Sequence, residues 1–263
     1  AVIANIDNDH LETYGNSFKN LKKSFRKFCL NIPFQGKLFA NGDYQEVLEV
    51  VENLPRNISL YGFEDINDLQ ILEFTQNKNG SHFVLFDKKN NNKMNFKTNM
   101  IGKHNVLNVA AAIAVALDEG IPYEGIKKAL EKFIVIERRF QLISENVFEK
   151  DIILIDDYGH HPKELLVSIN TAKEVWPDRE ILVVFQPHRY TRTKALFEDF
   201  VSILSDCKNL ILLEIYPASE EPIKGYESED LIKQIKIKNP EAILVNGIDC
   251  LLYTSPSPRD SCA

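Results

Sequence analysis

Two carboxylates, a phenol and two imidazoles are crowded into the six residues Asp156–His161. An apolar run, Ile152–Ile155, precedes them and predicts a buried strand, while the apolar period after them predicts a helix over 163–175. In open α/β sheets, ligands bind at turns that follow the carboxyl ends of strands. The alternative is a polar turn in which an Asp caps the helix and the histidines have no role. The density of polar groups favours a functional site.

A second polar turn follows the predicted strand Ile181–Phe185. It contains His188, Arg189 and Arg192. Two guanidinium groups three residues apart at the start of a helix can hold one anion together. The pattern therefore predicts a second ligand-binding turn, suited to a carboxylate or a phosphate.

Two further groups of polar residues lie near the starts of predicted elements. Asp7, Asp9 and His10 follow a predicted strand at 2–6, and such side chains suit Mg²⁺, although a capped loop explains them equally well. His104, Asn105 and Asn108 lie where Gly102 opens an Ala-rich helix that reaches Glu119. Asn105 and Asn108 share a helix face, where their amides can bond a nucleobase edge or merely cap the helix.

Arg138 and Arg139 lie at a predicted domain boundary. Such a pair can clamp a phosphate, or it can form an ordinary surface ion pair. Spacing alone leaves both interpretations open.

Composition limits the class of protein. The 263 residues are 44% apolar and 26% charged, which is typical of a globular protein and long enough for two domains. The net charge of −7 and the absence of a basic run make nucleic acid an unexpected partner. No apolar stretch is long enough to cross a membrane, and no signal peptide is evident. Four cysteines without CxxC spacing argue against a zinc site and fit a reduced, cytoplasmic protein.

The order of the predicted elements indicates an α/β fold. Strands and helices alternate between 151 and 245, which predicts a parallel sheet with right-handed crossovers in a Rossmann-like domain. Residues 31–101 instead show short strands separated by turns, which we interpret as scaffold. We expect one domain over residues 1–136, a second over 137–250, and a tail at 251–263.

Five motifs together resemble the Mur ligases of bacterial cell-wall synthesis, over about residues 1–250. They are NIDNDHLETYG at 5–15, GKHNVLNVAAA at 102–112, ERRFQ at 137–141, IDDYGHHPKE at 155–164 and FQPHRYTRT at 185–193. The resemblance implies a partial central ATP-binding domain followed by a Rossmann-like C-terminal domain.

The resemblance is greatest to the branch of the family that joins L-alanine to UDP-N-acetylmuramate. It implies an ADP-forming amide ligase that uses ATP and Mg²⁺ and forms an acyl phosphate. The branch that recycles murein tripeptide is the second choice, because its turn has Phe-Ala where this chain has Tyr158-Gly159, and it lacks the PHRYTRT motif. A non-catalytic nucleotide-binding module is the alternative from another class.

The same resemblance implies a role for each candidate residue. His10 would bind magnesium, while His104, Asn105 and especially Asn108 would lie near adenine. Arg139, with Arg138, and Asp157 would hold ATP. The amino-acid and muramyl carboxylate region, and the reaction itself, would involve Tyr158, His160, His188, Arg189 and Arg192.

Two departures from the family pattern lead to further expectations. No G-x-x-x-x-G-K-[ST] loop is present, and the family's metal-binding Glu is absent. We therefore expect a fragment that lacks the N-terminal domain and phosphate loop and is inactive alone. The Ser- and Pro-rich residues 251–263 interrupt the pattern, so we expect a non-native, disordered tail.

Overall fold

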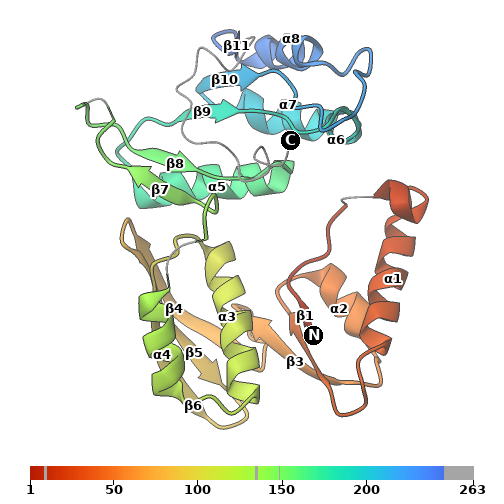
Figure 1. The fold of residues 1–263 in the computed structure, drawn as a ribbon, viewed down its shortest axis with the longest axis vertical. Helices are drawn as coiled ribbons and strands as arrows, with labels where there is room; N and C mark the ends of the chain where they lie inside the picture. The colour runs from red at the N-terminus through yellow and green to blue at the C-terminus, as the bar shows by residue number, and fades with distance from the viewer. Residues whose placement is uncertain (9–10, 134–135, 148, 246–263) are drawn as a thin grey trace. The chain divides into compact units, whose positions relative to one another are not determined.

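The computed structural model describes residues 1–8, 11–133, 136–147 and 149–245 (Figure 1). His10 and the predicted tail at 251–263 lie outside the described residues. The chain divides into two compact units, the first ending at Ile155 and the second beginning at Asp156. No helix in the described ranges is long and apolar enough to cross a membrane.

The first unit is built on a six-stranded sheet in the order β1-β2-β3-β4-β5-β6 (Figure 1). The strands β1 to β4 are parallel to one another, and β5 and β6 continue the sheet as antiparallel neighbours. The strands predicted as scaffold are therefore confirmed. Their bounds are Val2–Ile3 for β1, Lys37–Asn41 for β2, Asn57–Gly62 for β3, Leu69–Asn77 for β4, Gly80–Asp87 for β5 and Asn92–Thr98 for β6.

Gly80 sits at the turn between β4 and β5 with φ of 124°. A Cβ atom at this position would lie 2.1 Å from the carbonyl oxygen of Thr98 on the neighbouring strand. Only glycine fits this close approach of two backbones, which explains the Asn-rich turn that ends in glycine.

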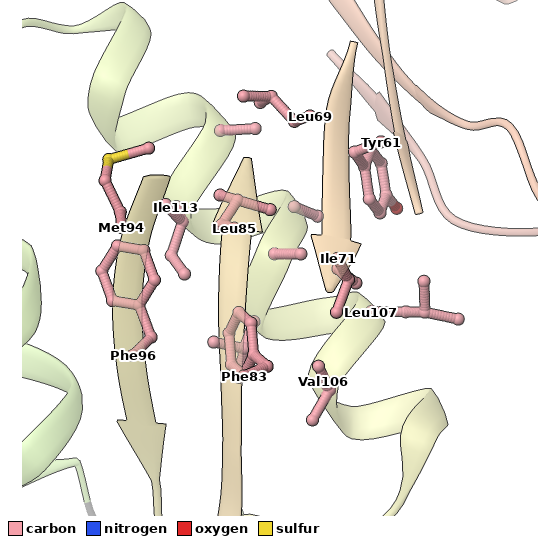
Figure 2. Packing of buried hydrophobic residues seen from close by; sticks show 14 of the residues in the cluster. Tyr61, Leu69, Ile71, Phe83, Leu85, Met94, Phe96, Val106, Leu107 and Ile113 are labelled. Atoms are coloured by element: carbon pink, nitrogen blue, oxygen red, sulfur yellow. The ribbon is translucent and has the colours of Figure 1, made fainter. Parts of the chain in front are cut away.

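Two hydrophobic cores flank this sheet. One contains Phe83, Leu85 and Phe96 from the strands and Ile113 from a helix (Figure 2). The other joins helices of the N-terminal region to β2, with Leu21, Val47 and Leu38 among its members. The helices are α1 at Phe18–Leu30, α2 at Gln45–Val51, α3 at Lys103–Asp118 and α4 at Tyr123–Lys132, preceded by a 3₁₀ turn at Leu11–Tyr14.

Helix α3 begins directly after Gly102, as predicted. Gly102 is its N-cap, with φ of 103°, and its N–H donates to Gln76 Oε1 at 2.9 Å. The predicted position of His104, Asn105 and Asn108 in the first turns of this helix is therefore confirmed.

The second unit alternates strands and helices around a parallel sheet, as predicted (Figure 1). The strand order in this sheet is β11-β10-β9. Its core contains Phe185, Phe200, Leu212 and Leu231. Its elements are α5 at Pro162–Val175, β9 at Leu182–Phe185, α6 at Tyr190–Ala195, α7 at Phe197–Ser205, β10 at Asn209–Leu213, α8 at Ser228–Lys238 and β11 at Ile243–Val245.

Two predicted elements need correction. The sequence predicts one helix over 194–206, but these residues contain the end of α6 and all of α7, which meet at Leu196 with φ of −118° and ψ of 24°. The strand predicted from the apolar run Ile152–Ile155 begins later: β8 covers Leu154–Asp156, and it pairs with β7, Gln141–Ser144, in a separate two-stranded sheet.

Candidate functional site

A capping box holds the turn between β8 and α5. Glu164 Oε2 accepts hydrogen bonds from the backbone N–H groups of His160 at 3.0 Å and His161 at 3.1 Å. In return, His161 Nδ1 accepts the N–H of Lys163 at 3.2 Å, and Pro162 occupies the first helical position. The helix cap is thus a histidine and not one of the aspartates, which leaves both carboxylates outside the cap.

Asp157 braces the same turn on its other side. Its Oδ1 accepts the N–H of Gly159 at 2.6 Å, and its Oδ2 accepts the hydroxyl of Ser168 at 2.9 Å. An ionised carboxylate offers about four lone-pair sites. Asp157 is therefore held in place by hydrogen bonds from the turn and from α5.

The second turn, between β9 and α6, is joined to the loop after β10 by backbone hydrogen bonds. Tyr216 N–H donates to Pro187 O at 2.8 Å, and Arg189 N–H donates to Tyr216 O at 2.8 Å. Gln186 Nε2 donates to Glu214 O at 3.1 Å. Arg189 has φ of 73° and ψ of 135°, a conformation that non-glycine residues seldom adopt. The loop after β10 therefore helps to hold this turn in a strained conformation.

Four aromatic rings from the three strand-end segments form a continuous row. Tyr158 meets His160 edge to face at 5.5 Å between ring centroids, and His160 lies 6.0 Å from His188. His188 in turn stacks on Tyr216 at 5.4 Å. The two polar turns predicted from the sequence thus converge, and three of their predicted site residues contact one another.

Burial lowers the pKa of His188 below its ordinary value, and the positive charges of Arg192, His160 and Arg189 lower it further. The carboxylate of Glu220 acts in the opposite direction on the same pKa. The neutral imidazole is therefore favoured near neutral pH, and a neutral imidazole can accept a proton.

The two arginines of the second turn have different environments. Arg192 is only 9% exposed, and its Nη1 donates to His188 O at 3.2 Å and lies 3.4 Å from His188 Nδ1. The side chain of Arg189 is 45% exposed, with Nη1 3.9 Å from Glu220 Oε1. Arg192 therefore acts on His188 from within the fold, whereas Arg189 presents a guanidinium that a dissolved anion can reach.

The candidate residues of the first unit lie at the start of α3 and before β7. Asn105 is buried and its amide donates to Ile101 O at 2.7 Å, so its amide group serves the fold. Asn108 is exposed on the same helix and His104 is partly exposed. Arg138 and Arg139 are both exposed, and Arg138 N–H donates to Gln141 Oε1 at 2.8 Å. Asn108 is thus more accessible to a base than Asn105.

Within the described ranges, no group of three or more His, Cys, Asp or Glu side chains could hold a metal ion. The predicted magnesium ligand, His10, falls outside those ranges. The described residues therefore assign no magnesium site.

Two residues that contact the second turn, Tyr216 and Glu220, were not predicted from the sequence. Both lie in the loop after β10, the strand between β9 and β11. The signal that could have found them is topological, because the loop after each strand of a parallel sheet opens at the same edge as the loop after its neighbour.

A small pocket of about 260 Å³ opens beside this loop, at the carboxyl ends of the three parallel strands. Its lining is mostly apolar and includes Leu213, Tyr216 and Val245. It is the usual location for a ligand on an open parallel sheet.

Two family descriptions match this chain. The Mur ligase middle domain matches residues 1–116, and the Mur ligase glutamate ligase domain matches residues 138–252. A UDP-N-acetylmuramate–L-alanine ligase of Psychrobacter arcticus is 40% identical over 239 residues, which are 90% of this chain and 50% of the relative. The chain thus spans about half the length of the curated relatives it matches.

Solved structures show the same fold. The UDP-N-acetylmuramate–alanine ligase of Thermotoga maritima superimposes with a TM-score of 0.70 at 24% identity, covering 97% of this chain and 53% of that one. The MurF ligase of Thermotoga maritima, solved in complex with ADP, gives 0.66 at 16% identity, covering 94% and 52%. With both domain families matched in order along most of its residues, the chain belongs to the Mur ligase family.

Proposed function

We propose that this chain forms the central and C-terminal parts of an ATP-dependent ligase that joins L-alanine to UDP-N-acetylmuramate in peptidoglycan synthesis. The observation that carries the proposal is the 40% identity to a ligase of that name over 90% of the chain. The turns after β8 and β9 support it, because the contact of His160 with His188 brings their cations, imidazoles and a carboxylate together. The proposed domain bounds are 1–136 and 137–250. The proposed location of the reaction is the cytoplasm.

The proposed chemistry has two steps. The γ-phosphoryl group of ATP is transferred to the lactyl carboxylate, and ADP leaves. The amine nitrogen of L-alanine then attacks the acyl carbon, the bond from carbon to the phosphate oxygen breaks, and the amine gives up a proton. We assign acceptance of that proton to His160 or His188, since neutral imidazoles suit this role near pH 7.

Anion binding is assigned to the arginines. Arg189 is the exposed guanidinium of the second turn, and we propose that it pairs with the carboxylate of L-alanine. Arg192 lies on the buried side and holds the same turn by donating to the backbone carbonyl of His188. Tyr158 lies beside His160 and completes the wall of this amino-acid subsite.

Nucleotide-binding roles are proposed from the family resemblance. Asp157 is proposed to accept a ribose hydroxyl, and Arg139, with Arg138, to contact phosphate oxygens. Asn108 is proposed to contact the adenine edge, with His104 and Asn105 beside it. Mg²⁺ is proposed to neutralise phosphate charge, with His10 as a ligand.

ADP release tests the proposal. The chain is joined to the part of the Psychrobacter arcticus relative that its match does not cover, and is supplied with Mg-ATP and UDP-N-acetylmuramate. One reaction receives L-alanine and another receives murein tripeptide. The unjoined chain is assayed in parallel.

ADP release that depends on L-alanine is the expected result. Release only with the tripeptide would replace the proposed activity by the recycling reaction. A folded joined protein that binds ATP but releases no ADP with either acceptor would favour a non-catalytic nucleotide-binding module.

A further inference from the structure

Glu220 was not among the site residues predicted from the sequence. It nevertheless contacts the second turn through two hydrogen bonds and one ion pair. Its Oε2 accepts the backbone N–H of Thr191 at 2.9 Å, and its Oε1 accepts the Thr191 hydroxyl at 2.7 Å. Both donors belong to the first turn of α6, one residue before the buried Arg192. Glu220 therefore anchors the start of α6 from a different loop.

The same carboxylate also faces the exposed arginine. Glu220 Oε1 lies 3.9 Å from Arg189 Nη1, and the Glu220 side chain is 21% exposed against 45% for Arg189. The acid is thus the more buried partner, and its hydrogen bonds with Thr191 fix its position. A fixed negative charge restricts a long cationic side chain to one region of space and reduces the entropy lost when a ligand is bound.

The protonation state of Glu220 fits this role. Burial raises its pKa, but the hydrogen bonds from Thr191 and the charge of Arg189 lower it more, so the pKa lies below its ordinary value. The Glu220 carboxylate is therefore ionised near neutral pH, where it can pair with the Arg189 guanidinium. It also opposes the loss of positive charge at His188, whose pKa it raises.

We infer that Glu220 is a positioning residue: its carboxylate holds the first turn of α6 through Thr191 and directs the Arg189 guanidinium toward the amino-acid subsite. The inference rests on the proposed function for the identity of the anion, the carboxylate of L-alanine. The contacts of Glu220 with Thr191 and Arg189 do not depend on that identity.

Charge and shape can be separated by substitution. Glu220→Gln keeps the length and one acceptor oxygen for Thr191 but removes the charge that faces Arg189. Glu220→Asp keeps the charge on a shorter side chain. Glu221→Gln is the matched control. Glu221 is the exposed neighbour of Glu220, and its substitution removes the same charge from the same loop.

The first measurement uses the 263-residue chain and needs no activity. NMR records the Arg189 Nε–Hε signal and the titration of His188 in each variant. Glu220→Gln is expected to shift the Arg189 signal and to lower the pKa of His188, whereas Glu221→Gln leaves both unchanged. Equal spectra for Glu220→Gln and the parent chain would overturn the inference.

The second measurement uses the joined enzyme. Glu220→Gln is expected to raise KM for L-alanine about tenfold while kcat changes less than about threefold, and Glu220→Asp recovers part of the loss. An equal fall in kcat and in thermal stability, without a selective change in KM, would reduce Glu220 to a structural cap and overturn the inference. If the joined enzyme is silent, the proposed function fails, and the NMR comparison alone decides the role of Glu220.

Discussion

The imidazole of His188 stacks on the phenol ring of Tyr216, with ring centroids 5.4 Å apart and planes inclined by 21°. The backbones of the same two residues form an isolated parallel bridge between the loops after β9 and β10. Side chain and backbone therefore hold the two loops together at one point.

Replacing Tyr216 by alanine is expected to destabilise the protein by about 0.5–1.5 kcal/mol, the usual range for an aromatic pair. It also exposes one face of His188 to water, so the pKa of His188 should rise toward its ordinary value. Tyr216→Phe keeps the ring and should change neither quantity. Chemical denaturation and an NMR titration of His188 measure both effects. A Phe variant as unstable as the Ala variant would show that the hydroxyl, and not the stack, matters.

His188 should make the stability of the protein depend on pH. Its folded-state pKa lies below the ordinary value of 6.5, mainly because it is buried. Below about pH 6.5 the unfolded chain binds a proton that the folded protein resists, so the free energy of unfolding falls as the solution is acidified. Above that pH both states are neutral at His188, and its full contribution to stability is present.

Thermal midpoints between about pH 5 and pH 8 test this linkage. His188→Asn should lose less stability on acidification than the parent chain. The exposed His82→Asn serves as the control and should follow the parent curve. Parallel curves for all three proteins would refute the link.

The backbone at Arg189 predicts an opposition between stability and activity. Its φ of 73° costs a non-glycine residue of order 1–3 kcal/mol. Arg189→Gly should therefore stabilise the fold by about 1 kcal/mol, after allowance for the greater freedom of glycine in the unfolded chain. Arg189→Ala removes the same guanidinium without relieving the strain.

Both Arg189 variants should weaken L-alanine-dependent ADP release in the joined enzyme by at least about tenfold. Only the glycine variant should unfold at a higher denaturant concentration than the parent. Lys224→Ala, an exposed charge in the loop after β10, is the control for both assays. If the glycine variant is as unstable as the alanine variant, the left-handed backbone is not a source of strain.

The capping box should be worth about 1 kcal/mol to the second unit. Glu164→Ala removes the acceptor for the N–H groups of His160 and His161, whereas Glu164→Gln keeps an acceptor of similar length. We expect the alanine variant alone to lose that stability, as measured by chemical denaturation. Equal stability of the two variants would mean that water replaces the carboxylate without cost.

Both turns of the candidate site could be predicted because each motif follows an apolar strand. The pairing of β8 with β7, outside the sheet that contains β9, could not be predicted. The contributions of Tyr216 and Glu220 could not be predicted. Each is a single residue in a loop without a motif, and its role depends on which strand neighbours β9 in space. Strand order is a tertiary property that local periodicity does not contain.

Two local features of the second unit also differ from the sequence-based predictions. No break was predicted at Leu196, where α6 ends and α7 begins. An aspartate was the expected alternative cap for α5, since Asp is a far commoner cap than His. The actual cap is His161, because Asp157 is already bonded to Gly159 and Ser168.

The bonds of the two adjacent histidines in the first turn define opposite tautomers. His161 Nδ1 accepts the N–H of Lys163, so in the neutral ring its proton lies on Nε2. His160 Nδ1 lies 3.1 Å from Tyr158 O, and because a carbonyl cannot donate, that nitrogen must carry the proton. Neutral His160 is left with its lone pair on Nε2, whereas the lone pair of His161 is committed to the helix. Of the two histidines, only His160 can accept a proton on a ring nitrogen without breaking a hydrogen bond at the start of α5.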